Sequence, residues 1–544
     1  MRRIALLLLL LLTTSAASGA PDEDEVQEGL RNRIEAAVGV PIELRVAGEL
    51  IHAAAALPTF YERRVYHAAW SEDGRPSALA RKLLDAIRAA DREGLRPTDY
   101  HLAAIEGLLL EDGKGPTPQR STADLIDLDL LLTDAFLIYG SHLLSGRVDP
   151  VSLDPLWIAN RRERDLVALL ESALESGRIE EALEELLPPY EGYRRLREEL
   201  ARQRAVAADE GWPTVPDGPK LAPGDEGPRV AALRERLLSM GPRPTDADEV
   251  FDEELQRAVV AFQQRHGLEP DGVVGPTTLR ELNVSAEDRA RQIELNLERW
   301  RWLPNDLGDP YIIVNIAGFE LDVIESGTRA LTMRVVVGKP YRRTPVFSDQ
   351  LTYLVLNPSW HVPRHLAVQD ILPLIKKDPG YLRRQRMRVI RGNTPVPAGS
   401  IDWSSVTARN FDFRLRQDPG PTNALGRVKF MLPNRFNVYL HDTPSRELFE
   451  RAARDFSSGC IRLQKPIELA EYVLRGAPGW TRERLEARIH SGLEQTVSLP
   501  RPIPVHLLYW TAWAEPDGSV QFRPDIYGRD AILAKAFTEP PPAP

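Results

Sequence analysis

Cysteine is almost absent from this chain of 544 residues, because Cys460 is the only one. A single cysteine excludes an intramolecular disulfide, so packing and hydrogen bonds alone must stabilise the fold. An unpaired cysteine has two ordinary interpretations. It is either a small buried core residue or a reactive thiol, and only the residues around it can decide between them.

Long hydrophobic runs are also scarce. Residues 125–144 form one, but this run contains Asp127, Asp129 and Asp134, which would be costly in hydrocarbon. It therefore indicates a buried helix of a soluble domain. The other run covers residues 4–12, follows two arginines and precedes small and polar residues up to Ala20. That order is typical of a secretory signal peptide over residues 1–20.

The apolar part of this segment is short for a bilayer, so we expect cleavage and not an uncleaved inner-membrane anchor. The mature chain would then be free in an extracytoplasmic space, with no stable membrane span. Positive charge is lacking too, since the formal net charge is −10. Nothing in the composition indicates binding to nucleic acid.

The hydrophobic period changes along the chain. Apolar residues recur at helical spacing in the first half, as at Leu79, Leu83 and Ile87, whereas short β-rich runs begin near residue 311. Stretches rich in Pro and Gly mark the boundaries. The predicted fold class is multidomain α+β, with a helical scaffold domain at 26–210, a linker at 211–228, a small three-helix domain at 229–285, a mostly β domain at 300–537 and a disordered tail at 538–544.

The residues around Cys460 indicate a reactive thiol. A thiol becomes a useful nucleophile when a neighbouring group favours its thiolate, and histidine is the usual partner. Tyr439 and His441 are two residues apart on a predicted strand, so they project from the same face, with His441 at the strand end. In the small-residue turn before Cys460, the backbone N–H groups of Ser458 and Gly459 could form an oxyanion hole.

This pattern resembles the catalytic signature of the L,D-transpeptidases with a YkuD-type catalytic domain. The resemblance extends over residues 299–527 and includes the segments at 337–345, 357–363 and 526–530. Residues 262–279 resemble the helical peptidoglycan-binding module of wall enzymes, although a generic three-helix spacer would give a similar pattern. The whole chain resembles the large YcbB-like murein L,D-transpeptidases. Many family members have histidine where this chain has Ser458, a serine that the YcbB-like branch tolerates.

The resemblance implies a cysteine acyltransferase that forms 3→3 cross-links between peptidoglycan stem peptides in the periplasm, contributes to cell-wall biogenesis and cell shape, and is a carbapenem target. Cys460 would be the nucleophile and His441 the general base, oriented through the backbone of Asp442. Substrate-binding roles are expected for Arg462, Tyr439 and Trp360, although a surface salt bridge or core packing would also explain them. No metal or other cofactor is implied. Possible partners are the carboxypeptidases or synthases that generate tetrapeptide donors.

The resemblance also makes residues 365–430 a cap inserted between two sheet segments. Loops this long in compact domains usually have a role. A basic cap face would suit carboxylate-rich wall peptides, whereas the alternative is a solvated charged surface. The arginines concerned are Arg383, Arg384, Arg386, Arg388 and Arg391.

Other functions stay open at this point. Water or a lipoprotein lysine could replace the stem amine as acceptor, which would give an L,D-carboxypeptidase or a protein-anchoring enzyme, and a non-catalytic wall-binding scaffold would retain the same modules. A metal-dependent wall peptidase needs clustered ligands. The chain has no His-Glu-x-x-His, and Pro363 disfavours the helix that would align His361 with His365.

The thiol should be indispensable. Because Cys460 is the only cysteine, one equivalent of iodoacetamide should label it and abolish transpeptidation. Cys460→Ala should abolish activity without unfolding the protein, as judged by circular dichroism. Full activity of the alanine variant would exclude thioester catalysis.

Overall fold

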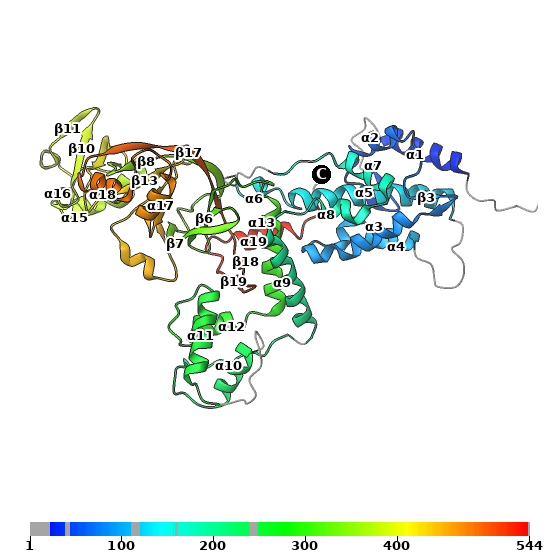
Figure 1. Cartoon of the computed structure of the whole chain (residues 1–544), viewed down its shortest axis with the longest axis horizontal. Helices are drawn as coiled ribbons and strands as arrows, with labels where there is room; N and C mark the ends of the chain where they lie inside the picture. Colours follow the sequence, from blue (N-terminus) through cyan, green and yellow to red (C-terminus); the bar gives the residue numbers. More distant parts are fainter. Residues whose placement is uncertain are drawn as a thin grey trace, which may run out of the picture.

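The computed structural model describes residues 22–37, 44–109, 120–155, 157, 161–209, 211–238 and 249–541. The predicted signal peptide at 1–20 lies outside the described residues. Three bodies meet around one central helix, α13 (Ala286–Arg301), with the scaffold domain on one side, the β-rich domain on the other and the small helical domain below (Figure 1). No helix in the described part of the chain is both long and apolar enough to cross a membrane. The α+β prediction is confirmed.

The scaffold domain is built around the buried helix α5 (Thr122–Ser145). Two of the acids in its apolar run are fully buried and hydrogen bonded, which explains why they are tolerated. Asp129 accepts from the Tyr61 hydroxyl at 2.6 Å, and Asp134 accepts from the N–H of Ala53 at 2.6 Å. The domain also contains α1 (Glu23–Ala37), α2 (Leu57–Arg63), α3 (Ala78–Arg88), α4 (Leu102–Leu109), α6 (Pro150–Leu153), α7 (Leu166–Ser176), α8 (Ile179–Glu184) and the short hairpins β1 (Arg45–Val46)–β2 (Glu49–Leu50) and β3 (Ser71–Glu72)–β4 (Arg75–Pro76). Helix α9 (Glu191–Ala208) packs along α13.

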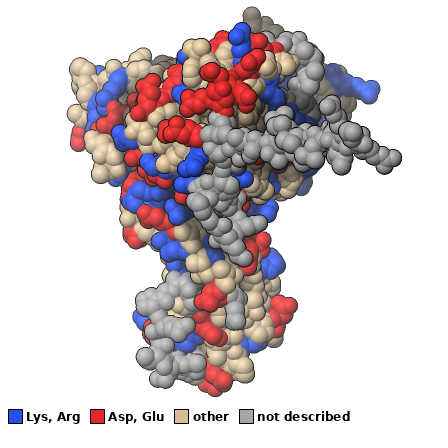
Figure 2. All heavy atoms as spheres, turned by 90° about the vertical axis from the view of Figure 1, so that its right-hand side faces the viewer, with Lys and Arg blue, Asp and Glu red and all other residues tan. Residues whose placement is uncertain are grey.

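Acidic side chains gather on the upper part of the face that the scaffold domain presents in Figure 2. The small domain projects below that face. Part of the acidic excess of the chain therefore lies on the scaffold, away from the β-rich domain at the opposite end of the molecule in Figure 1.

The small domain comprises α10 (Pro228–Leu238), α11 (Glu253–Arg265) and α12 (Pro276–Leu282). The prediction of a linker at 211–228 is wrong, because this segment completes the domain. Val215 and Leu221 are buried in its core, Leu221 bridges to Val274, and Asn283 accepts the N–H of Val215 at 2.9 Å. The prolines and glycines exclude a helix here, but the two apolar side chains still find a core.

The small domain also packs on the β-rich domain. The ring of His266 stacks between Phe262, at 3.9 Å, and Phe522, at 5.6 Å. Arg523 donates from Nη1 to the carbonyl of Arg265 at 2.7 Å. These contacts join α11 to the hairpin of β18 (Ala512–Ala514) and β19 (Val520–Phe522), so the domain has a defined position.

The β-rich domain is a closed, mixed barrel. Its strands run in the order β15-β7-β16-β14-β13-β8-β17-β5-β6, and β6 also pairs with β7, which closes the ring. Helices α17 (Pro466–Val473), α18 (Arg482–His490) and α19 (Arg529–Ala536) complete the domain. The strands are β5 (Tyr311–Asn315), β6 (Glu320–Glu325), β7 (Thr328–Gly338), β8 (Phe347–Leu356), β13 (Val428–Met431), β14 (Leu440–His441), β15 (Asp455–Ser457), β16 (Ile461–Leu463) and β17 (Gln495–Leu508).

The cap is a separate body at the far end of the barrel (Figure 1). It has a four-stranded sheet, ordered β11-β10-β12-β9, and its own hydrophobic core. The predicted bounds of 365–430 are corrected, because β9 belongs to the cap sheet and β13 to the barrel. Its elements are β9 (Trp360–His361), α14 (Arg364–Leu366), a π-helical turn (Ala367–Ile371), α15 (Leu372–Lys377), α16 (Tyr381–Arg384), β10 (Met387–Arg391), β11 (Thr394–Val396) and β12 (Phe413–Gln417).

Helix α13 joins the scaffold to the barrel through buried charge. Arg301 donates to Glu298 at 2.8 Å, and both side chains are fully buried. Glu298 also accepts the N–H of Val148 at 2.8 Å, while Arg301 donates to the carbonyl of Glu93. Glu93 ends the 3-10 helix Ala89–Glu93 and Val148 lies in the loop after α5, so this pair fixes two separate segments of the scaffold on a helix that leads into the barrel.

The C-terminal residues lie against the scaffold, so the predicted disorder is wrong for 538–541. Arg147 donates from Nη2 to the carbonyl of Glu539 at 2.6 Å and from Nη1 to that of Ala536 at 3.2 Å. Pro541 is buried. The low complexity of the tail gave no sign of an arginine from another domain. Residues 542–544 lie outside the described residues.

Loss of the buried pair should destabilise the junction of scaffold and barrel. Glu298→Ala leaves the Arg301 guanidinium buried without its counter-charge, for which we expect a loss of about 3–5 kcal/mol in the free energy of unfolding. Glu35→Ala is the matched control, since its ion pair with Arg31 is exposed and should change stability by less than about 0.5 kcal/mol. Denaturant unfolding measures both. Equal stability of the two variants would contradict the assignment.

Candidate active site

A cavity of about 1000 Å³ lies between the barrel and the cap. The barrel contributes Cys460 and His441, and the cap contributes apolar side chains from its first helical segment. All predicted site residues line this cavity except Asp442, whose contact with the site is through its backbone. Its lining includes Lys339, Arg342, Arg343, Trp360, Leu366, Asp370, Ile371, Leu374, Lys429, Tyr439, His441, Ser458, Gly459, Cys460 and Arg462.

The nucleophile lies on a tight turn between β15 and β16. The Ser457 hydroxyl donates to the carbonyl of Cys460 at 2.5 Å and accepts the N–H of Gly459 at 3.1 Å. Gly459 has a φ of +114°, a conformation that residues with a Cβ rarely adopt. The turn is therefore stabilised from within by the buried hydroxyl of Ser457.

A second loop holds the same turn from outside. The Thr344 hydroxyl donates to the carbonyl of Gly459 at 2.9 Å and accepts the N–H of Gly338 at 3.0 Å. Tyr527, from the C-terminal part of the domain, donates to the carbonyl of Gly338 at 2.6 Å. Three segments distant in sequence thus fix the position of the cysteine backbone.

The structure corrects one predicted oxyanion donor. Because Gly459 already gives its N–H to Ser457, this group is not available to a substrate oxygen. The N–H groups of Ser458 and Cys460 have no acceptor among the described residues. The sequence indicated a turn with unpaired backbone N–H groups, but it could not show which of these groups forms a hydrogen bond within the turn.

The imidazole of His441 is held by the residue that follows it. Its Nδ1 bonds to the carbonyl oxygen of Asp442 at 2.5 Å, which is the backbone contact expected from the sequence and which leaves Nε2 free to accept a proton. The Asp442 carboxylate is turned away and accepts the N–H of Arg427 at 2.8 Å. The rings of Tyr439 and His441 meet edge to face at 5.7 Å, so they share one face of the chain.

Cys460 and His441 come from neighbouring strands, since Leu440 of β14 pairs with Ile461 of β16. The Cys460 Sγ lies 3.9 Å from the carbonyl oxygen of Asn437, and it also interacts with the backbone and the side chain of Tyr439. The thiol and the imidazole therefore face the same cavity without a hydrogen bond between them.

Burial makes both partners neutral. It lowers the pKa of His441 to about 3, and the charges of Arg462 and Lys429 act in the same direction. Burial also raises the pKa of the Cys460 thiol, whereas hydrogen bonding to Tyr439 and the charges of Lys429 and Arg462 lower it. Near neutral pH the resting site holds a thiol and a neutral imidazole, with two cations beside them.

Lys429 is a site residue that sequence reasoning missed. It pairs with His441 across β13 and β14, and its Nζ lies 3.9 Å from the centre of the Tyr439 ring. Burial lowers its pKa. The only sequence signal was a lone lysine between the buried residues Val428 and Phe430, which places it on the opposite face of the strand.

Arg462 lies across the site from Lys429. Its Nε is buried and has no hydrogen-bond partner among the described residues. A buried guanidinium with unused donors is suited to an anionic ligand. Most of the predicted basic face of the cap does not offer such donors, because Arg384, Arg388 and Arg391 form ion pairs with aspartates of the cap.

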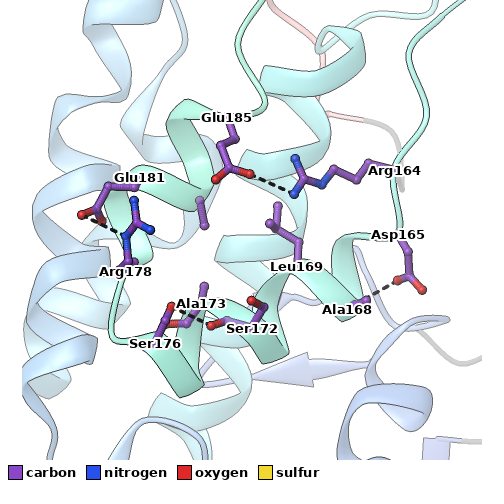
Figure 3. Close-up of a pocket in the computed structure, with 11 residues that line it drawn as sticks. Arg164, Asp165, Ala168, Leu169, Ser172, Ala173, Ser176, Arg178, Glu181 and Glu185 are labelled. Atoms are coloured by element: carbon purple, nitrogen blue, oxygen red, sulfur yellow. Dashed lines mark hydrogen bonds and ion pairs between the residues drawn. The ribbon is translucent and has the colours of Figure 1, made fainter.

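A second cavity, of about 420 Å³, lies between α7 and α8 of the scaffold (Figure 3). The charged side chains at its rim pair with one another: Arg164 forms an ion pair with Glu185, and Arg178 forms one with Glu181. It lacks a cysteine and a histidine among its lining residues. Within the described ranges, no three His, Cys, Asp or Glu side chains are grouped to hold a metal ion.

Residues 309–480 match the family model for the L,D-transpeptidase catalytic domain. The β-rich domain is therefore similar to the L,D-transpeptidase catalytic domain over these residues. Residues 226–282 match the family described as "Putative peptidoglycan binding domain", and residues 55–200 match the "Scaffold domain" family. These matches confirm the resemblance of the β-rich and small domains that the sequence indicated.

Relatives with known names agree with this assignment. A Haemophilus influenzae protein named "Putative L,D-transpeptidase" is 38% identical over 255 residues, which are 46% of this chain and 50% of that protein. The chain thus spans about half the length of this curated relative.

Two solved L,D-transpeptidases are also similar. The Xylanimonas cellulosilytica enzyme is 17% identical, with 54% of this chain and 98% of that one covered and a TM-score of 0.18. Mycobacterium tuberculosis L,D-transpeptidase 1 is 13% identical, with 38% and 63% covered and a TM-score of 0.15. TM-scores this low do not define the fold of the whole chain.

Lys429 should favour the thiolate of Cys460. Removing its charge in Lys429→Met should raise the pKa of Cys460 further and slow alkylation by iodoacetamide about tenfold at fixed pH. Lys429→Arg should retain most of the rate. Lys465→Met is the control, because Lys465 contacts the carbonyl of Thr332 and does not line the cavity. Identical pH profiles for Lys429→Met and the wild type would exclude this role.

Proposed function

We propose that the protein is a periplasmic peptidoglycan L,D-transpeptidase that forms 3→3 cross-links through a thioester on Cys460, with His441 as general base. One observation carries the proposal. In a domain that matches the L,D-transpeptidase family, the only cysteine of the chain faces the same cavity as a histidine whose Nδ1 is fixed, so its Nε2 can accept a proton.

In the first half-reaction, Nε2 of His441 takes the thiol proton as Sγ of Cys460 attacks the amide carbonyl before the terminal D-residue of a tetrapeptide stem. The carbonyl π electrons move to oxygen, and the N–H groups of Cys460 and Ser458 stabilise the oxyanion. When the intermediate collapses, the C–N bond breaks and His441 returns the proton to the leaving amine. A D-amino acid departs and a thioester remains.

In the second half-reaction, the side-chain amine of a diamino acid in a neighbouring stem attacks the thioester. His441 accepts a proton from this amine and returns it to the Cys460 sulfur as the C–S bond breaks, which regenerates the thiol and the neutral imidazole. The product is an amide between two stems. Burial keeps the imidazole neutral, so its Nε2 is unprotonated at the start of each half-reaction, and the low pKa of His441 favours return of the proton.

The charge of the groove supports a carboxylate-rich peptide as substrate. Lys429 and Arg462 flank the thiol, and Arg343 and Lys339 line the same cavity. We assign Arg462 to a stem carboxylate and place Trp360 and Tyr439 along the donor peptide. The peptidoglycan-binding domain, fixed on β19, would hold the enzyme on the wall.

Product analysis tests the reaction. The mature protein is incubated with disaccharide-tetrapeptides, and the products are identified by mass spectrometry. Cys460→Ala is the control. Dimers that have lost one D-alanine support transpeptidation. Tripeptide monomers alone would show that water is the acceptor, and no Cys460-dependent product would indicate a non-catalytic scaffold.

The pH profile tests the base. Acylation of Cys460 by a carbapenem should change little between about pH 5 and pH 8, because His441 is neutral and the thiol protonated over this range. In His441→Ala the thiolate must form by proton loss to solvent. Its rate should therefore rise about tenfold per pH unit below the thiol pKa, and fall about 10²–10⁴-fold below the wild type near pH 7.

Ser458→Ala is the comparison variant. It retains its backbone N–H, so the flat profile should persist, with a loss of about fivefold for one hydrogen bond. A flat profile in His441→Ala would show that another group is the base.

A further inference from the structure

Arg342 contacts both the cap and the nucleophile turn, although it belongs to neither. It lies in the loop between β7 and β8, and its side chain is 14% exposed. On the cap side it makes a two-point ion pair with Asp370, at 2.5 and 2.9 Å, and donates to Gln369 at 3.0 Å. On the other side its Nη1 donates to the hydroxyl of Ser458 at 3.0 Å.

The cap segment that reaches Arg342 has unusual backbone geometry. Gln369 and Asp370 lie in the π-helical turn Ala367–Ile371, a rare conformation that is frequently found at functional sites. Leu366, Ile371 and Leu374, in and beside this turn, line the cavity. One short segment therefore covers the groove with its apolar residues and holds Arg342 with its polar ones.

We propose that Arg342 is a positioning residue that couples the seated cap to the nucleophile turn through Ser458. Asp370 and Gln369 orient the planar guanidinium, and a second N–H of Nη1 fixes the hydroxyl of Ser458, two positions before Cys460. The N–H of Ser458 and that of Cys460 are the groups left unpaired in this turn, so their direction depends on how the turn is held. The guanidinium fork suits this task, because it can bond several acceptors in fixed directions, as an ammonium cannot.

The coupling gives a reason for serine at position 458. A hydroxyl accepts a hydrogen bond from Arg342, whereas alanine would leave the turn tied only by Ser457, Thr344 and the backbone. The proposal rests on the proposed function, because it concerns the N–H groups that stabilise the oxyanion during acylation.

A double-mutant cycle tests the coupling, with acylation of Cys460 by a small β-lactam as the readout. Asp370→Asn should slow acylation about tenfold and Ser458→Ala about fivefold. Because both changes break one linkage, the double variant should be no slower than the slower single variant. Arg342→Met should lose about tenfold to a hundredfold, and Arg342→Lys should recover only part of that.

Two controls separate positioning from general structural damage. Alkylation by iodoacetamide does not use the oxyanion donors, so it should stay within about twofold of the wild type in Asp370→Asn and Ser458→Ala. Asp378→Asn removes another ion-paired aspartate of the cap, one that does not line the cavity, and should acylate normally. If Arg342→Met fails to fold, the double-mutant cycle of Asp370→Asn and Ser458→Ala still tests the coupling, because these variants retain Arg342.

Effects of Asp370→Asn and Ser458→Ala that multiply in the double variant would overturn the proposal. So would an acylation rate of folded Arg342→Met equal to that of the wild type. A wild-type protein that no β-lactam acylates would instead overturn the proposed function, and this inference with it.

Discussion

The buried hydroxyl of Thr344 is the contact on which the active site depends. It joins the carbonyl of Gly459 to the N–H of Gly338, and thereby fixes the turn that carries Cys460 against the loop after β7. The approach is possible only because position 338 has no side chain, since a Cβ there would lie 2.1 Å from the carbonyl oxygen of Arg342. The same loop then extends to Arg342, so the backbone of the nucleophile and the position of the cap share one support.

The electrostatics of the site follow from its burial. The barrel wall desolvates both His441 and Cys460, which favours the neutral form of each. The positive charges of Lys429 and Arg462 favour the thiolate of Cys460 and disfavour the protonated imidazole of His441. They therefore stabilise negative charge on sulfur, while the proton stays on the thiol in the resting site. Such a site keeps the thiol protonated at rest, which in an oxidising compartment also limits its oxidation.

Ion pairs, hydrogen bonds and ring contacts between particular side chains hold the domains in fixed positions. The buried Glu298–Arg301 pair joins α13 to two segments of the scaffold, Arg147 holds the C-terminal residues, and His266 fixes the small domain against Phe522. A wall-bound small domain would therefore present the groove at a set distance from the glycan. Orientation of the groove relative to the wall is then a property of the fold.

The sequence by itself determined the division into helical and β-rich parts and brought Cys460 and His441 to one site, because hydrophobic period and motif spacing are local properties. It also placed Tyr439 beside His441, since residues two apart on a strand share a face. Only the tertiary structure showed that residues 211–228 complete the core of the small domain and that residues 538–541 contact the scaffold. It also showed that the N–H of Gly459 is hydrogen bonded to Ser457. It also revealed Lys429 and Arg342. Each of these depends on a partner far away in the chain, and neither propensity nor spacing specifies which of many distant groups will meet a given donor or charge.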